Sequence, residues 1–201
     1  MFDLTKIPSL AEAEWLNSPQ DWSVDADRRL TARSRDKTDF WRITHYGFIR
    51  DDGHALLAPH QGGFSATLSF AGGYEALYDQ CGLMVRSGPE AWVKFGVEFT
   101  DGVPHLSSVV THTTSDWSAR PLPAALAAPV TIRATRIGDA LLLDSRSEPD
   151  EAWRMERLAY WPADPATVFV GPYLCSPERA GFEASFTGFT LVPPQVRSLH
   201  T

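Results

Sequence analysis

The stretch QCGLMVRSGPEAWVKFGVEF at residues 80–99 decides the fold class. In its first half Cys81, Leu83 and Val85 alternate with other residues, and its second half repeats the alternation with apolar residues at 93, 95, 97 and 99. Side chains two residues apart point to the same face of a β-strand, so each half predicts a strand with one buried face. Gly88 and Pro89 between the halves predict a turn. Strands of this kind belong to an antiparallel sheet.

Similar runs, separated by turn residues, continue along the chain. They predict further strands at 40–49, 64–71, 106–113, 130–136, 139–145, 153–160, 167–174 and 182–192. About ten or eleven strands are too many for one open sheet in a chain of this length, so two antiparallel sheets packed face to face are expected. The capping-box spacing of Ser9 and Glu12 predicts one short helix at about 9–15. Residues 1–201 are expected to form a single domain with its core at about 15–192, a short N-terminal segment and a tail from Pro193.

Composition excludes several function classes. The 201 residues are 43% hydrophobic and carry a net charge of -7, which is enough apolar material for a core and the wrong sign for duplex nucleic acid or an anionic membrane. No run approaches about 18 apolar residues, so no membrane span is expected. Two cysteines cannot build a disulfide framework and no signal peptide opens the chain, so the expected compartment is the cytoplasm.

No cofactor or metal is expected. The six histidines lack the spacing that converges on a transition metal. The glycine pairs at 62–63 and 72–73 precede strands and lack the lysine of a phosphate-binding loop, so they are interpreted as turns.

A set of local strings resembles a known family. The strings are Trp15–Pro19, Thr38–Arg42, Tyr46–Phe48, Tyr78–Arg86, Trp92–Glu98, Ser115–Ser118, Arg136–Ala140 and Gly171–Pro177. Together they are similar to the domain of unknown function that includes the yeast regulation-of-enolase protein, placed among the concanavalin A-like lectins and glucanases. The resemblance runs from about Trp15 to Leu191 and implies an all-β, concanavalin A-like jelly-roll sandwich. It implies no activity, because a fold is not a function.

The polar faces of the strands at 80–86 and 92–99 supply the candidate ligand-binding residues. If these strands lie in the concave sheet, as the resemblance implies, they project side chains into one groove, with Trp117 in a loop at its rim. The candidates are Tyr78, Asp79, Gln80, Arg86, Trp92, Lys94, Glu98 and Trp117. Hydrogen-bonding groups beside an aromatic platform suit sugar recognition, since a pyranose has hydroxyls at its edge and C–H groups on its face. An ordinary solvated face is the alternative, and for Trp117 a cap on the core.

Hydrolysis of glycans needs two carboxyl groups at a set separation. Glu98 is the candidate catalytic residue, and Asp79 or Asp116 is the candidate second carboxylate across the sheet. The related glucanases place their carboxylates two residues apart on one strand, and that arrangement is missing here.

Three function hypotheses follow. The first is a cytoplasmic module that binds a carbohydrate or a similar polar ligand in its concave groove. The second is a glycan hydrolase that uses Glu98. The third is a regulatory protein-interaction module with a protein partner, suggested by the enolase-regulator resemblance. The sequence leaves the oligomeric state open.

Overall fold

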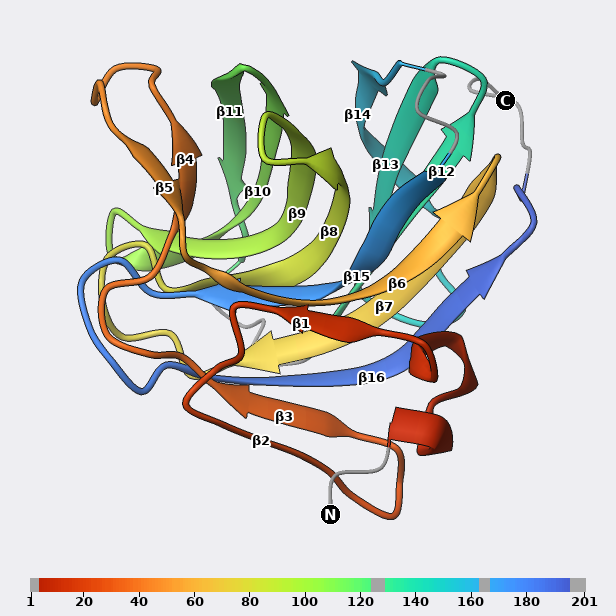
Figure 1. Cartoon of the computed structure of the whole chain (residues 1–201), viewed down its shortest axis with the longest axis horizontal. Helices are drawn as coiled ribbons and strands as arrows, with labels where there is room; N and C mark the ends of the chain where they lie inside the picture. Colours follow the sequence, from red (N-terminus) through yellow and green to blue (C-terminus); the bar gives the residue numbers. More distant parts are fainter. Residues whose placement is uncertain (1–3, 124–128, 163–166, 196–201) are drawn as a thin grey trace.

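The computed structural model describes residues 4–123, 129–162 and 167–195. These residues form two seven-stranded antiparallel sheets, packed face to face, and one separate two-stranded hairpin (Figure 1). The predicted all-β class and the predicted pair of antiparallel sheets are therefore confirmed.

The front sheet carries the strands that the sequence singles out. Its strand order is β1-β6-β15-β8-β9-β10-β11. The strands are β1 (Glu14–Leu16), β6 (His54–Gln61), β15 (Thr167–Cys175), β8 (Gln80–Gly88), β9 (Ala91–Thr100), β10 (Val103–His112) and β11 (Thr114–Pro121).

The back sheet covers the inner face of the front sheet. Its strand order is β14-β13-β12-β7-β16-β3-β2. The strands are β14 (Arg154–Tyr160), β13 (Ala140–Arg146), β12 (Val130–Ile137), β7 (Phe64–Gly72), β16 (Glu183–Val192), β3 (Leu30–Arg33) and β2 (Asp21–Val24).

The main core lies between the two sheets and follows the predicted alternation. Leu83 and Val85 of β8 and Val93 and Phe95 of β9 all face it and are buried. The two strands pair antiparallel with Leu83 opposite Phe95, so their apolar faces coincide. The turn that was expected between them connects β8 to β9.

The predicted helix at 9–15 is wrong. The chain forms two short 3-10 turns, η1 (Leu4–Lys6) and η2 (Pro8–Leu10), and then enters β1. In β1, Trp15 pairs with Leu56 of β6, so sheet pairing overrides the local capping signal. Strands β2, β3, β6 and β11 were not predicted, and the predicted strand at 40–49 is two short strands joined by a loop.

A second hydrophobic cluster covers the outer face of the front sheet, and we call it the front cluster. Its buried members are Phe40, Ala55, Leu57, Met84, Trp92, Val109, Tyr173 and Cys175. The separate hairpin, β4 (Phe40–Arg42) and β5 (Ile49–Asp51), lies over this cluster, and in Figure 1 the front sheet bends around the foot of the hairpin. The outer face is therefore filled at its middle by packed side chains.

Ion pairs join the two sheets along one edge of the sandwich. Arg120 of β11 binds Glu156 of β14 with two hydrogen bonds, of 2.8 and 2.6 Å. Arg157 of β14 binds Asp116 of β11 at 2.7 Å. Because these contacts run from the edge strand of one sheet to the edge strand of the other, they fix the sheets relative to each other at that side.

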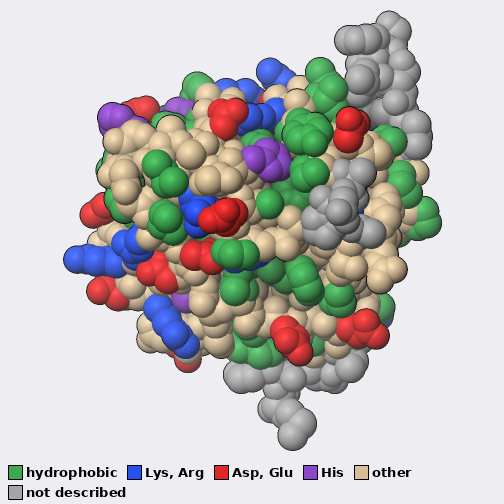
Figure 2. All heavy atoms as spheres, turned by 45° about the horizontal axis from the view of Figure 1, so that its top comes forward, with side chains coloured by type: hydrophobic (Ala, Val, Ile, Leu, Met, Phe, Trp, Pro, Cys, Tyr) green, Lys and Arg blue, Asp and Glu red, His purple; other side chains and the backbone are tan. Residues whose placement is uncertain are grey.

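The surface carries charges of both signs. Figure 2 shows acidic, basic and hydrophobic side chains interspersed over one face, without a broad basic patch. No helix in the described ranges is long and apolar enough to cross a membrane. Cys81 and Cys175 are both buried and free.

Candidate functional site

The β4–β5 hairpin is held on the front sheet by residues of β4. Phe40 is fully buried in the front cluster. The backbone N–H of Arg42 donates a hydrogen bond to Ser115 Oγ of β11 at 2.9 Å, and its guanidinium pairs with Glu90 at 2.7 Å. Arg42 is buried by these contacts, whereas Ile43 is exposed.

The tip of the hairpin, residues 43–48, holds an aromatic group in a strained loop. Ile43 and His45 have φ values of 65° and 64°, a region that a β-branched residue such as isoleucine avoids. The ring of Tyr46 stacks on Phe48 at 5.4 Å and meets Trp41 edge-on at 5.7 Å. These contacts hold the aromatic rings of the tip together over the sheet.

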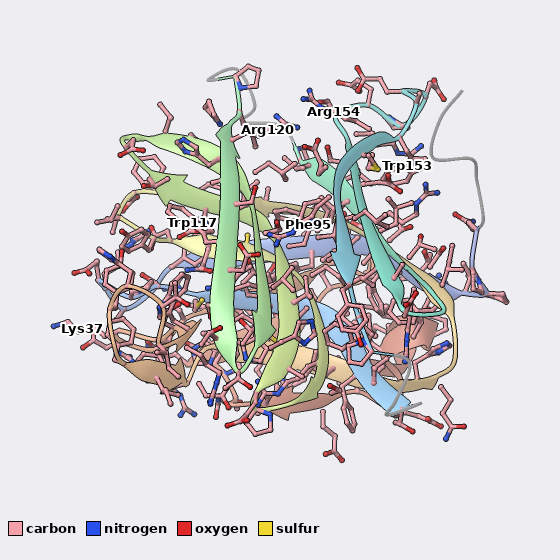
Figure 3. The ribbon with its side chains drawn as sticks, turned by 90° about the horizontal axis from the view of Figure 1, so that it is seen from above. Lys37, Phe95, Trp117, Arg120, Trp153 and Arg154 are labelled. Carbon is pink, nitrogen blue, oxygen red and sulfur yellow. The ribbon has the colours of Figure 1, made fainter. Side chains whose placement is uncertain are left out.

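A pocket of about 160 Å3 lies between the hairpin and the outer face of the front sheet. Its rim is aromatic and its floor is polar. The lining residues are Asp39, Trp41, Tyr46, Phe48, Tyr78, Gln80, Lys94, Glu98, Val109, Trp117, Pro177 and Glu178. Trp117 of β11 faces the pocket, and 43% of its surface is exposed. Phe95 of β9 points into the core instead. Figure 3 shows the two residues on either side of the strands.

Three polar side chains form the floor, and all are more than nine-tenths buried: Gln80, Lys94 and Glu98. Lys94 pairs with Asp39 at 3.4 Å. Gln80 donates through Nε2 to the carbonyl of Tyr78 at 3.2 Å, and its Oε1 has no hydrogen-bond partner among the described residues. A buried acceptor without a donor costs free energy, so Gln80 Oε1 is an unsatisfied polar atom of a pocket-lining residue.

A short hydrogen-bond chain ties the floor to the rim. Trp117 Nε1 donates to Ser107 Oγ at 2.9 Å, and Ser107 Oγ donates to Glu98 Oε2 at 2.9 Å. The chain fixes the indole ring and orients the carboxyl group of Glu98 beneath it.

Burial shapes the charges in the floor. Removal from water raises the pKa of the Glu98 carboxyl, and the nearby Lys94 ammonium and the Ser107 hydroxyl only partly oppose this. Burial also works against the ammonium of Lys94, but the carboxylates of Asp39 and Glu98 outweigh it and the pKa of Lys94 is raised. Lys94 is therefore a cationic hydrogen-bond donor at neutral pH and not a neutral amine nucleophile.

Two phenols in the lining of the pocket join the hairpin tip to the segment before β8. Tyr46 OH of the hairpin tip and Tyr78 OH lie 3.1 Å apart. This hydrogen bond and partial burial raise the pKa of Tyr78 to about 12. Tyr78 has a φ of 65°, so its backbone is strained where it forms the wall.

The structure brings together five of the eight predicted binding residues. Those that line the pocket are Tyr78, Gln80, Lys94, Glu98 and Trp117. Trp117 is at the rim, as expected, but it lies in strand β11 and not in a loop. It does not cap the core, because it faces the outer side of the sheet.

The other three predicted residues lie outside the pocket. Trp92 is fully buried in the front cluster beneath the hairpin, so it offers no exposed platform. Arg86 is held by Asp51 through two hydrogen bonds of 2.8 Å at the foot of the hairpin. Asp79 is fully buried and bound to Arg179.

Sequence reasoning missed the hairpin contribution to the pocket. Trp41, Tyr46 and Phe48 form much of the rim, and Asp39 pairs with the floor lysine. Three aromatic residues in the eight-residue segment 41–48 were the available signal. Their position over the sheet depends on long-range contacts that no local pattern contains.

The carboxylates do not meet as expected. Asp79 is fully buried and accepts hydrogen bonds from the backbone N–H groups of Glu75 and Ala76, and Asp116 pairs with Arg157 outside the pocket. Asp39 and the exposed Glu178 are instead the carboxylates that line the pocket with Glu98. Within the described ranges, no group of three histidine, cysteine or acidic side chains is arranged to hold a metal ion.

Comparisons with known proteins give the same family along nearly the whole chain. Regulation of enolase protein 1 of Saccharomyces cerevisiae is 38% identical over 196 residues, which cover 98% of this chain and 97% of the relative. The crystal structure of a functionally unknown protein from Saccharomyces cerevisiae superposes with a TM-score of 0.87 at 38% identity, covering 94% of this chain and all of that one.

A more distant structure shares the fold. The carbohydrate binding module CBM66 from Bacillus subtilis superposes with a TM-score of 0.58 at 12% identity, covering 89% of this chain and 94% of the module. The fold is therefore the expected concanavalin A-like jelly-roll sandwich. The family described as protein of unknown function DUF1349 matches residues 15–194, and the chain belongs to that family.

Proposed function

We propose that the pocket between the β4–β5 hairpin and the front sheet binds a carbohydrate. The observation that carries the proposal is the buried polar floor beneath an aromatic rim, and above all Gln80 Oε1, a buried acceptor without a partner among the described residues. Sugar hydroxyls can donate to Gln80 Oε1 and accept from Lys94, because each hydroxyl is both donor and acceptor.

The rim supplies the other half of sugar recognition. The exposed faces of Trp117 and Phe48 can contact the C–H face of a pyranose. The likeness to a carbohydrate binding module supports the proposal at the level of the fold. The cytoplasmic compartment expected from the sequence belongs to the proposal, and the two free, buried cysteines are compatible with it.

The test is binding to a panel of immobilised glycans by the wild type and three variants. Trp117→Ala is expected to weaken binding about tenfold or more, because it removes both the ring face and the donor to Ser107. Trp117→Phe keeps a ring but not the N–H group, and it separates stacking from hydrogen bonding. Tyr160→Ala is the matched control, since Tyr160 is an exposed aromatic residue outside the pocket.

The outcomes are distinct. Selective binding by the wild type and Tyr160→Ala, with loss in Trp117→Ala, supports the proposal. Equal binding by all three variants would place the ligand elsewhere on the molecule. A blank panel would overturn carbohydrate binding and favour the protein-interaction hypothesis.

Hydrolysis is a second candidate, favoured by one observation. Burial raises the pKa of Glu98, as a general acid requires, and the carboxylates of Asp39 and Glu178 line the same pocket. Against this, Asp39 is already paired with Lys94. If the protein is a hydrolase, the wild type releases product from the panel glycans, and Glu98→Gln binds the glycans without releasing product. Wild-type protein that releases no product at high concentration would contradict hydrolysis.

A further inference from the structure

The outer face of the front sheet is divided into two separate hollows. One is the aromatic pocket of about 160 Å3. The other, of about 500 Å3, lies on the β1–β6–β15 side and is lined by residues that include Glu14, Pro59, Arg86 and Phe169. The two hollows share no lining residue among those that the structure describes.

The foot of the hairpin forms the barrier between them. Asp51 binds Arg86 through both carboxylate oxygens, and Asn17 Nδ2 donates to the carbonyls of Asp51 and Gly53, each at 2.9 Å. Beneath this network, Phe40 and Trp92 of the front cluster are fully buried and fill the middle of the face. A polymer chain lying along the sheet would have to displace this packed barrier.

The hairpin tip also bounds the aromatic pocket. There the hydroxyls of Tyr46 and Tyr78 meet at 3.1 Å. The pocket is therefore walled on the cluster side and on the tyrosine side, and its volume is well below the roughly 300 Å3 at which pockets for larger ligands begin. A pocket of this size suits one sugar ring, and a chain that continued in either of these two directions would meet packed or hydrogen-bonded side chains.

We infer that the pocket takes a single sugar unit end-on, as a free monosaccharide or the terminal residue of a glycan, and rejects internal units of a polysaccharide. This rests on the proposed carbohydrate binding and names the class of ligand. The ring would lie against Trp117 with its hydroxyls on Gln80 and Lys94, and any remaining chain would leave toward solvent at the exposed rim.

The test compares ligands with and without chain ends. Binding is measured by calorimetry with glucose, xylose, mannose and fructose and with their linear oligomers of two to four units. Cyclodextrins, which are rings of glucose units without a chain end, are the matched probe for the glucose series. For the series that binds, end-on recognition predicts affinities within about threefold from one unit to four, and no competition by the ring.

A variant pair locates the contact. Phe169 is exposed in the second hollow, outside the aromatic pocket. Phe169→Ala is expected to leave the affinity for the four-unit oligomer unchanged, whereas Trp117→Ala is expected to lower it about tenfold or more.

The inference and the proposal fail in different ways. Affinity that rises about tenfold or more with chain length, binding of the cyclic glucan, or weakening by Phe169→Ala would overturn end-on recognition and leave carbohydrate binding intact. An absence of binding in every series would overturn both.

Discussion

Asp79 and Arg179 are 100 residues apart in the sequence and form a buried clamp behind the pocket. The guanidinium of Arg179 donates to Asp79 Oδ2 through Nε at 3.0 Å and through Nη2 at 2.6 Å. The same carboxylate accepts hydrogen bonds from the backbone N–H groups of Glu75 and Ala76 and from Ser176 Oγ. The clamp therefore joins the segment that carries Tyr78 to the segment that carries Pro177 and Glu178, and both segments line the pocket.

Asp79→Ala is expected to lower the free energy of unfolding by about 3 kcal/mol, because it leaves several donors without their buried acceptor. Urea denaturation measures the change. Glu75→Ala is the control, since Glu75 pairs with the same arginine in solvent and its loss should cost less than about 1 kcal/mol. Equal losses in the two variants would mean that the buried carboxylate has no special role.

Glu98 predicts a pH dependence of stability. Burial raises its pKa in the folded state above the ordinary value of 4.5, so the folded protein binds the proton more tightly than the unfolded chain does. The stability linked to this proton is fully present below the unfolded pKa and is lost as the pH rises through the folded pKa.

Glu98→Gln removes that dependence while keeping an acceptor for Ser107. The stability of the variant relative to the wild type is therefore expected to increase as the pH rises above the ordinary pKa of 4.5, measured by urea denaturation at each pH. Near-ultraviolet circular dichroism at each pH verifies that both proteins stay folded. A relative stability that decreases over this range would mean that Lys94 stabilises the carboxylate more than burial opposes it.

The hydrogen bond between Tyr46 and Tyr78 predicts that Tyr78 loses its proton at a higher pH than an ordinary tyrosine. The pKa of Tyr78 is raised to about 12, first by its hydrogen bond to Tyr46. Tyr46→Phe removes that partner and is expected to move the pKa of Tyr78 down toward its ordinary value of 10.0. Ultraviolet absorbance titration measures the shift. The titration curve of Tyr78→Phe is subtracted to isolate the signal of Tyr78. An unchanged titration would show that the two hydroxyls do not meet in solution.

Substitution of Trp92 is expected to lower the stability of the fold and not to remove a ligand contact. Its side chain is fully buried in the front cluster, where it packs against Phe40 with ring centroids 6.1 Å apart. Trp92→Ala is expected to cost about 3 to 5 kcal/mol in urea denaturation. Trp92→Phe should cost less, because it keeps an aromatic ring and removes an indole N–H that has no hydrogen-bond partner among the described residues. A nearly neutral Trp92→Ala variant would contradict this packing.

The position of Trp92 shows which part of the site could be predicted from the sequence. The alternation along 92–99 correctly places Trp92, Lys94 and Glu98 on one face of a strand, since that face depends only on local geometry. Whether the face meets solvent depends on Phe40, about 50 residues earlier, whose hairpin packs over one part of the face and leaves another part open. Lys94 and Glu98 therefore line a pocket while Trp92 is buried, and no local pattern distinguishes them.

Strands without alternation were missed for a related reason. In β6, the run from His54 to Ala58 is buried on both faces, because the core covers one side and the front cluster covers the other. In β11, by contrast, most side chains are exposed and the segment has the composition of a loop. It becomes a strand because Val109 of β10 pairs with Trp117 across a turn at Thr113.

The pocket is assembled from parts that lie far apart in the chain. Its walls come from the hairpin near residue 40, the strands between 80 and 117, and the segment at 177–178. An unfolded or partly folded chain cannot present this site, so a ligand that fits it binds the native state alone. By mass action, a ligand at a hundred times its dissociation constant adds about 2.7 kcal/mol to the free energy of unfolding. The melting temperature of the protein itself is therefore a label-free sensor with which to screen sugars for the one that this pocket accepts.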